Sequence, residues 1–196
     1  KGEYDTALDY YDRSLTIKEE LGDKDGINNN LNNIGLVHWN KGEYDTALDY
    51  LERSLAIAEE IGDKLGMGHG VGNIGIVHSD KGDYDKAVDY LEKYLAIQKE
   101  IGLAAADLIW STTYLYLNYK HLDKEYHVNE IHSLIKETEN IEFELNYAIY
   151  QLLEDIFYLE TAYNQIQEKA SAMDNGTKFL SYPIPKAIVE EWERVK

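Results

Sequence analysis

Glycines between Gly66 and Gly75 have the spacing that most suggests cofactor chemistry in this sequence. They contain the pattern G-x-G-x-x-G, which in dinucleotide-binding loops follows a strand and places a pyrophosphate at the start of a helix. No strand signal precedes them, and the same positions one repeat earlier carry asparagines such as Asn30 and Asn32. We therefore predict a helix here and no cofactor. Because an interior glycine costs a helix about 1 kcal/mol relative to alanine, this helix either flexes to admit a partner or lies close to a neighbouring backbone.

Histidines and carboxylates are the other residues with catalytic or metal-binding potential. His38 and His78 recur at one repeat position, which favours a packing role. His127 and His132 are separated by about 140 degrees around a helix and cannot hold one ion as an i, i+4 pair does. The sequence has no cysteine, which excludes thiolate ligands and nucleophiles, and its recurring carboxylates suit a solvated face. We predict no catalytic residues and no metal site, so the chain is not expected to be an enzyme.

Internal repetition is the strongest feature of the chain as a whole. Residues 41–80 match residues 1–40 at 25 of 40 positions, and residues 81–102 match residues 41–62 at 15 of 22 positions. A repeat of about 20 to 50 residues is typical of solenoids, in which each unit buries its apolar face against its neighbours. The sequence begins in the middle of a unit, which leads us to expect a piece of a longer protein.

Each unit is expected to form two antiparallel helices. Leu31 and Ile34 recur at helical spacing, and Leu48 and Leu51 do so again after Gly42. Glycine suits the end of the first helix because it adopts the left-handed conformation readily. The acidic residue that follows each turn glycine suits the start of the next helix, where free N–H groups favour negative charge. The pattern predicts an all-α fold.

The repeat resembles the tetratricopeptide repeat (TPR) family. The matching positions are Asn32-Asn33-Ile34-Gly35, Gly42, Tyr44-Asp45, Ala47-Leu48, Tyr50 and Leu55, repeated as Asn73-Ile74-Gly75, Gly82, Tyr84-Asp85, Ala87-Val88, Tyr90 and Leu95. The 40-residue period exceeds the usual length of about 34 and is similar to the longer units of kinesin light chains. HEAT repeats share this period, but the small residues Gly35 and Ala47 at the helix crossing favour the tetratricopeptide repeat. The resemblance implies an α-solenoid, a right-handed superhelix of antiparallel hairpins.

We expect the repeat array to span residues 1–175. Within it, units 1–40, 41–80 and 81–120 are clear and 121–175 is degenerate. Apolar spacing after Gly102 predicts helices at 110–119, 128–135, 142–154 and 157–172. Residues 176–196 are expected to form a linker and a capping helix that begins near Pro183, which we prefer to a detachable peptide or a membrane anchor.

The resemblance also implies a binding groove, because the first helix of each hairpin lines the concave side in this family. The groove positions carried over are Asn29, Asn32, Asn33, Leu36, Trp39 and Asn40 in one unit, His69, Gly72, Asn73, Ile76, Ser79 and Asp80 in the next, and Ile109, Thr112, Thr113, Tyr116, Tyr119 and Lys120 in the degenerate unit.

Asparagines at equivalent groove positions suggest how a ligand is held. Asn33 and Asn73 each offer a donor and an acceptor, so a ladder of them can hold a peptide backbone without reading its sequence. Trp39, Tyr116 and Tyr119 are then large, rigid contacts for side chains. The alternative is that these asparagines only solvate the helix or cap a local turn.

Charge limits the partners. The formal net charge is -18, with 37 acidic and 19 basic residues, which opposes binding to nucleic acids and anionic membranes. Lys120 is the only basic residue among the groove positions, so a clamp for an acidic C-terminus is not expected. We expect a cytoplasmic protein whose partner is a neutral or basic peptide or protein.

The expected function is a non-catalytic protein interaction module that binds a peptide or helix and acts as a scaffold or regulatory segment. The alternative is the C-terminal sensory or assembly segment of a larger bacterial signalling enzyme, because the tail from Phe179 to Val195 resembles the repeat tails of bacterial adenylate/guanylate cyclases. A homodimer through the first repeat is a further expectation, since Leu8, Leu15 and Ile17 lack a covering helix there.

Overall fold

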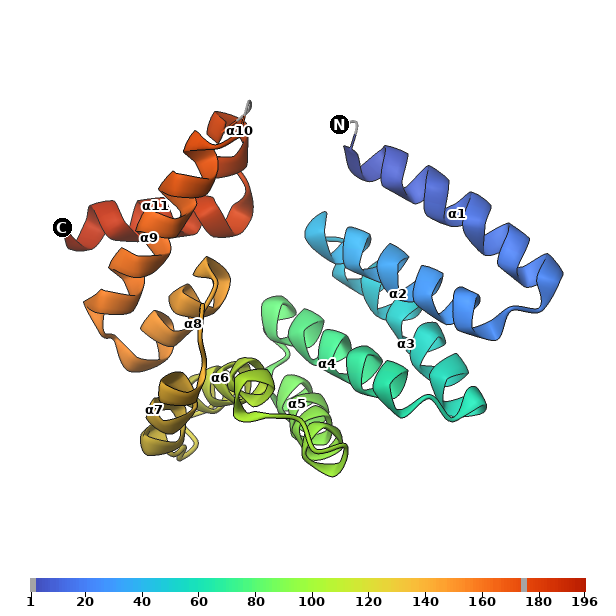
Figure 1. The fold of residues 1–196 in the computed structure, drawn as a ribbon, viewed down its shortest axis with the longest axis horizontal. Helices are drawn as coiled ribbons and strands as arrows, with labels where there is room; N and C mark the ends of the chain where they lie inside the picture. The colour runs from blue at the N-terminus through green and yellow to red at the C-terminus, as the bar shows by residue number, and fades with distance from the viewer. Residues whose placement is uncertain (1–2, 174–175) are drawn as a thin grey trace. The chain divides into compact units, whose positions relative to one another are not determined.

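The computed structural model describes residues 3–173 and 176–196, which form eleven α-helices and no strand (Figure 1). The chain divides into two compact units, Lys1–Leu103 and Ala104–Lys196. The predicted all-α solenoid of helical hairpins is therefore confirmed.

The first unit consists of five helices that alternate in direction. They are α1 (Glu3–Leu21), α2 (Lys24–Asn40), α3 (Tyr44–Ile61), α4 (Lys64–Lys81) and α5 (Tyr84–Glu100). Each helix packs against the next one along the chain, and α2 also contacts α4 (Figure 1). Stacking of hairpins brings the first helices of successive repeats, α2 and α4, side by side.

Each helix in this unit ends one or two residues before a turn glycine. Gly42 and Gly62 have φ values of 76° and 70°, and Gly22, Gly82 and Gly102 share this left-handed conformation. The acidic residues after the glycines behave differently from one another. Asp23 caps α2 by accepting a hydrogen bond from the Gly26 amide at 2.9 Å, as predicted, whereas Glu43, Asp63 and Asp83 form no side-chain cap. Gly2 lies outside the described residues.

Apolar residues from alternating helices form the core of the first unit. Ala47 and Leu51 of α3 are fully buried together with Ile74 of α4. His38 stacks on Tyr50 with ring centroids 5.5 Å apart, and the equivalent pair, His78 and Tyr90, stacks at 5.7 Å. The packing role predicted for these two histidines is confirmed.

Close approach of a neighbouring side chain explains Gly72 of α4. A Cβ atom on Gly72 would lie 2.9 Å from the ring of Tyr94, and Gly68 faces the same ring. One repeat earlier, this space holds Asn28 and Ser54, whose side chains are hydrogen-bonded. Tyr94 thus replaces a serine, and glycines replace the asparagines that it would displace. The sequence suggested either that this helix flexes or that a neighbouring backbone lies close to it. In the structure, the atoms closest to Gly68 and Gly72 belong to side chains.

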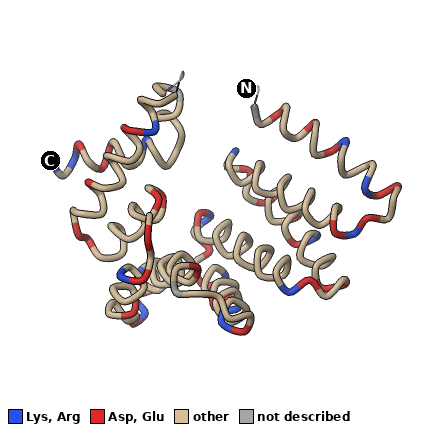
Figure 2. Tube along the Cα trace, in the orientation of Figure 1, with Lys and Arg blue, Asp and Glu red and all other residues tan. Residues whose placement is uncertain are grey.

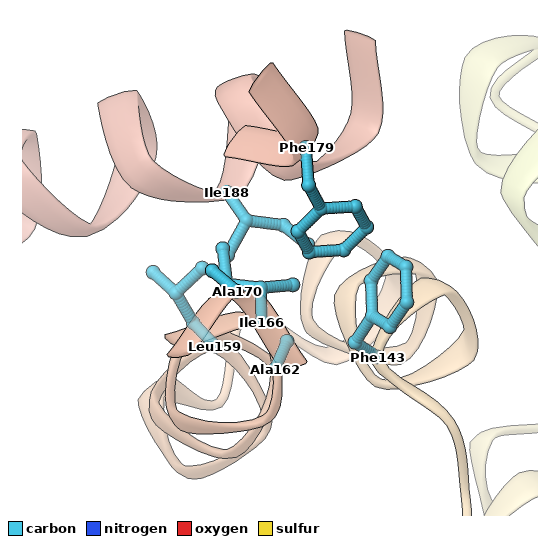
Figure 3. Packing of buried hydrophobic residues seen from close by; sticks show 7 residues of the cluster. All are labelled: Phe143, Leu159, Ala162, Ile166, Ala170, Phe179 and Ile188. Carbon is cyan, nitrogen blue, oxygen red and sulfur yellow. The ribbon is translucent and has the colours of Figure 1, made fainter. Parts of the chain in front are cut away.

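The second unit contains the remaining helices. They are α6 (Ala105–His121), α7 (Val128–Glu137), α8 (Phe143–Leu153), α9 (Ile156–Ser171), α10 (Gly176–Leu180) and α11 (Pro183–Val195). The four helices predicted after Gly102 correspond to α6, α7, α8 and α9. Helix α6 packs on α7 and α8, and α9 packs on α8, α10 and α11. Figure 3 shows Phe143, Leu159, Ile166 and Ile188 meeting in the core that joins α8, α9 and α11.

The last helix closes this core, as the sequence predicted. Prolines occupy its first turn, where no intrahelical amide donor is required. Ile188 is fully buried, and Trp192 stacks on Tyr163 of α9 with ring centroids 5.3 Å apart. The hydroxyl of Tyr150 in α8 donates a hydrogen bond to Glu191 at 2.6 Å. Residues 176–180, before this helix, form α10, which packs on α9.

Charged residues are distributed along the traces of both units, and acidic ones outnumber basic ones (Figure 2). Within the described residues, no helix combines the length and hydropathy needed to span a membrane.

Candidate peptide-binding face

The predicted groove residues of the first unit lie on neighbouring helices. We call them the α2–α4 face. It comprises Asn29, Asn32, Asn33, Leu36, Trp39 and Asn40 of α2, and His69, Gly72, Asn73, Ile76, Ser79 and Asp80 of α4. On α2, the helical period separates them from Leu31 and Ile34, which are fully buried in the core.

Two side-chain hydrogen bonds connect α2 to α4 across this face. The amide nitrogen of Asn73 donates to Oδ1 of Asn32 at 2.8 Å. The indole of Trp39 donates to Oδ2 of Asp80 at 2.7 Å. In both pairs the partners are 41 residues apart, one more than the repeat length. The bonds therefore join a groove position to the next position of the following repeat.

Asn33 is the groove residue best placed to bind a ligand. Its side chain is half-buried and has no hydrogen-bond partner among the residues that the structure describes. Asn29, one helical turn earlier, and His69 on α4 are exposed and likewise unpaired within the described part of the chain. Asn40 instead donates to the carbonyl of Leu36 at 2.8 Å, which is the local capping alternative that the sequence allowed.

The remaining α4 positions differ in environment. Ile76 and Gly72 are buried, and Ser79 is half-buried. The side chain of Asp80 retains solvent-exposed area, but neighbouring groups desolvate its carboxylate and raise its pKa, an effect that the hydrogen bond from Trp39 opposes. An ionised carboxylate that has lost part of its hydration gains more than a fully solvated one from a cationic ligand group.

The predicted groove residues of the second unit have internal partners. Thr113 is fully buried, and its hydroxyl donates to the carbonyl of Ile109, itself buried, at 2.7 Å. Tyr116 is buried and donates to Glu130, and both burial and this carboxylate raise the pKa of Tyr116. Thr112 is also buried. The ring of Tyr119 stacks on Tyr116.

Lys120 has a structural role in the second unit. Its ammonium group donates to the carbonyl of Gln151 at 2.8 Å and to Glu154 at 2.7 Å. These partners lie at the C-terminal end of α8, where the free carbonyls of a helix favour positive charge. The only basic groove candidate is therefore occupied by its own chain.

Sequence reasoning missed the pairing of the face residues with one another. Asn32, Asn73, Trp39 and Asp80 were each considered as contacts for a ligand, not for the adjacent helix. The available signal was that Asn32 and Asn73, and likewise Trp39 and Asp80, are complementary hydrogen-bonding types one position out of register. Asn28 and Asn30 were also overlooked as buried residues, bonded to Ser54 and Ser14 respectively.

The glycine-rich pattern does not have the strand–loop–helix context of a dinucleotide site. The G-x-G-x-x-G pattern lies wholly inside α4, where its glycines are packed against neighbouring helices. Among the described residues, no three histidine, cysteine or acidic side chains cluster so that they could hold a metal ion.

The stacked antiparallel hairpins define a helical-repeat protein of the α-solenoid class. The profile of the tetratricopeptide repeat matches residues 1–60 and 26–100, which together cover about half of the sequence. The chain therefore belongs to the tetratricopeptide repeat family, whose members generally mediate protein–protein interaction through extended surfaces. The match ends at residue 100, so the resemblance of the tail to cyclase repeat tails stays a prediction.

A solved structure supports the same fold. It is a Podosopora anserina protein described as a kinesin light chain with nearly identical TPR-like repeats. The two chains share 15% sequence identity and superpose with a TM-score of 0.57, over 98% of this chain and 90% of the other. At this identity the likeness shows the fold alone. No protein of curated function matches the sequence.

Proposed function

We propose that this chain is a non-catalytic interaction module that holds an extended peptide on the α2–α4 face, in a scaffolding or regulatory role in the cytoplasm. The observation that carries the proposal is the half-buried side-chain amide of Asn33, which has no hydrogen-bond partner among the described residues. A primary amide can donate to a peptide carbonyl and accept from a peptide N–H at once. Asn29, one turn away and exposed, can repeat that contact along the ligand.

The electrostatics of the face favour a neutral or basic peptide. Asp80 is the only acidic residue on it, and one of its oxygens, Oδ2, already accepts the bond from Trp39. The other oxygen can accept from a lysine or arginine of the ligand. The net charge of -18 adds a long-range attraction for cations. We therefore propose that the preferred peptides carry a basic residue near Asp80.

Single-residue variants separate ligand binding from repeat packing. Asn33→Ala removes an amide that has no partner in the described structure, whereas Asn32→Ala breaks the bond between α2 and α4 and leaves Asn33 intact. Asn164→Ala, an exposed position of α9, is the matched control for loss of a surface amide. The probe is a panel of labelled 12-residue peptides of extended, basic, neutral or acidic composition, and the readout is fluorescence anisotropy.

Asn33→Ala is expected to weaken binding of the basic peptides by about fivefold to thirtyfold, as for loss of one or two hydrogen bonds. Asn164→Ala should leave affinity unchanged, and all variants should keep the circular dichroism of the parent. Equal affinity of Asn33→Ala and the parent protein for every bound peptide would remove the α2–α4 face as the binding site. Binding of the acidic peptides alone would contradict the proposed charge preference.

A further inference from the structure

Helix α1 exposes apolar side chains that its counterparts cover. Tyr10, Ile17 and Leu21 are 65%, 55% and 72% exposed and fall on one side of the helix. We call these residues, together with Glu20, the Tyr10 face. The equivalent residues of α3, one repeat later, are Tyr50, Ile57 and Ile61, and each of them is half-buried.

The cover on α3 and α5 is the first helix of the same hairpin. His38 of α2 stacks on Tyr50, and His78 of α4 stacks on Tyr90 of α5. Three residues before each histidine, a glycine allows the helices to cross closely. A Cβ atom on Gly35 would lie 2.7 Å from Leu51, and one on Gly75 would lie 3.0 Å from Leu91.

An ion pair recurs at the far end of the same contact. Lys24 in the first turn of α2 lies 2.5 Å from Glu60 of α3, and Lys64 of α4 lies 2.5 Å from Glu100 of α5. The equivalent acceptor on α1 is Glu20, which is exposed and has no ion pair within the described residues. In the part of the chain that the structure describes, the Tyr10 face therefore has no stacked ring, no closely crossing helix and no paired cation, whereas α3 and α5 have all three.

We propose that the Tyr10 face is a docking surface for an amphipathic helix of the same kind as α2 and α4. That helix carries lysine in its first turn, a glycine eleven residues later and a histidine three residues after the glycine, as Lys24, Gly35 and His38 do. The lysine pairs with Glu20 and the histidine stacks on Tyr10. This site lies on α1 and is separate from the α2–α4 face.

A second copy of the chain does not offer such a helix. Its α2 and α4 already use the glycine and histidine side against α3 and α5, where Gly35 and Gly75 are buried. One departure shapes the site further: Tyr11 occupies the position of Leu51 and Leu91 at the crossing. The larger ring makes a small residue in the docking helix more necessary.

A synthetic helix tests the site directly on the full 196-residue chain. The probe is a fluorescein-labelled peptide with the sequence of residues 24–40, titrated against the protein and followed by anisotropy. A second peptide, with leucine at the position of Gly35 and the glycine of position 26 kept, tests the close crossing. The protein variants are Tyr10→Ser and Glu20→Gln, both at exposed positions. Phe157→Ser, 63% exposed in the second unit, is the matched control for loss of a surface ring.

The first peptide is expected to bind saturably, with affinity reduced about tenfold by Tyr10→Ser and about threefold by Glu20→Gln, and unchanged by Phe157→Ser. The leucine peptide should bind at least about tenfold more weakly than the first. Absence of saturable binding, or equal affinity for Tyr10→Ser and the parent, would overturn the proposal. So would a dimer in sedimentation velocity that Tyr10→Ser abolishes, because a second copy would then be the occupant.

Discussion

Residues of the same type have different roles in this protein, and their surroundings decide which role each one has. Four of the asparagines between Asn28 and Asn33 lie within two helical turns of one another and have different surroundings. Asn28 is buried against Ser54, Asn29 is exposed, Asn32 joins the next repeat and Asn33 is left unpaired among the described residues. The same residue type thus serves core packing, repeat stacking and the proposed ligand contact.

The effect of a glycine on stability also depends on its surroundings. Two alanine substitutions can measure this effect. A Cβ atom on Gly35 would meet Leu51 at 2.7 Å and the backbone oxygen of Ala47 at 3.2 Å, so Gly35→Ala should destabilise the protein by about 1 to 2 kcal/mol despite better helix propensity. A Cβ atom on Gly68 would meet Ile97 at an ordinary 3.4 Å. Gly68→Ala should therefore stabilise the protein by up to about 1 kcal/mol.

Urea unfolding followed by circular dichroism measures both changes as shifts of opposite sign in the midpoint. Two shifts of the same sign would contradict the packing explanation, in which Gly35 of α2 is crowded and Gly68 of α4 has room for a methyl group.

At the scale of elements, the last helix is attached by both apolar and polar contacts. Ile188 fills the core, while Glu191 accepts hydrogen bonds from Tyr150 of α8 and from Arg194 one turn later. The bonds from Arg194 and then Tyr150 lower the pKa of Glu191 to about 2. The ionised carboxylate therefore contributes to keeping α11 on the preceding hairpin.

Removal of this carboxylate should have a pH-dependent effect on stability. Because the folded pKa of Glu191 lies below the unfolded value, its contribution is present above the unfolded pKa of about 4.5 and is lost as the pH falls towards 2. The side chain of Arg194 is 69% exposed, so solvent screening limits the contribution to about 1 kcal/mol. Glu191→Gln should lower the free energy of unfolding by this amount at pH 7.

The matched control is Glu193→Gln, an exposed position on the same helix, which should change stability little. Unfolding of both variants by urea at pH 7 and near pH 2.5 provides the comparison. An effect of Glu191→Gln that persists in full at the lower pH would show that the charge is not responsible.

At the scale of the whole molecule, charge is strongly unbalanced. The sequence has 37 acidic and 19 basic residues, and some of the lysines pair with acids of neighbouring helices, as Lys24 does with Glu60 and Lys81 with Asp45. These pairs lie at the surface, where each contributes little. The excess of negative charge repels itself in the folded state, and we expect this repulsion to be the larger effect.

Salt should therefore stabilise this protein. An increase from about 10 mM to 300 mM NaCl reduces the Debye length from about 30 Å to below 10 Å and screens the long-range repulsion more than the close ion pairs. We expect Tm, measured by circular dichroism at pH 7, to rise by about 2 to 5 °C. KCl at equal ionic strength should give the same shift. A fall in Tm would mean that the ion pairs between helices outweigh the repulsion.

The sequence alone determined the repeat, its helical hairpins and the family. These features depend on local patterns, namely glycine at the turn positions and apolar residues at helical spacing, which act over a few residues. Gly42 and Gly62 could be assigned their left-handed conformation for that reason. The capping helix near Pro183 was equally accessible, since it combines a helix-starting signal with one apolar stripe.

Only the tertiary structure decided which side chains remain free. Asn32 and Asn33 are adjacent and identical in type, yet one bonds to Asn73 and the other has no partner in the described residues. The stagger between α2 and α4 that produces this difference depends on packing distances between helices, which no local pattern encodes. For the same reason, the fit of Tyr94 against Gly68 and Gly72 could not be read from a glycine-rich segment.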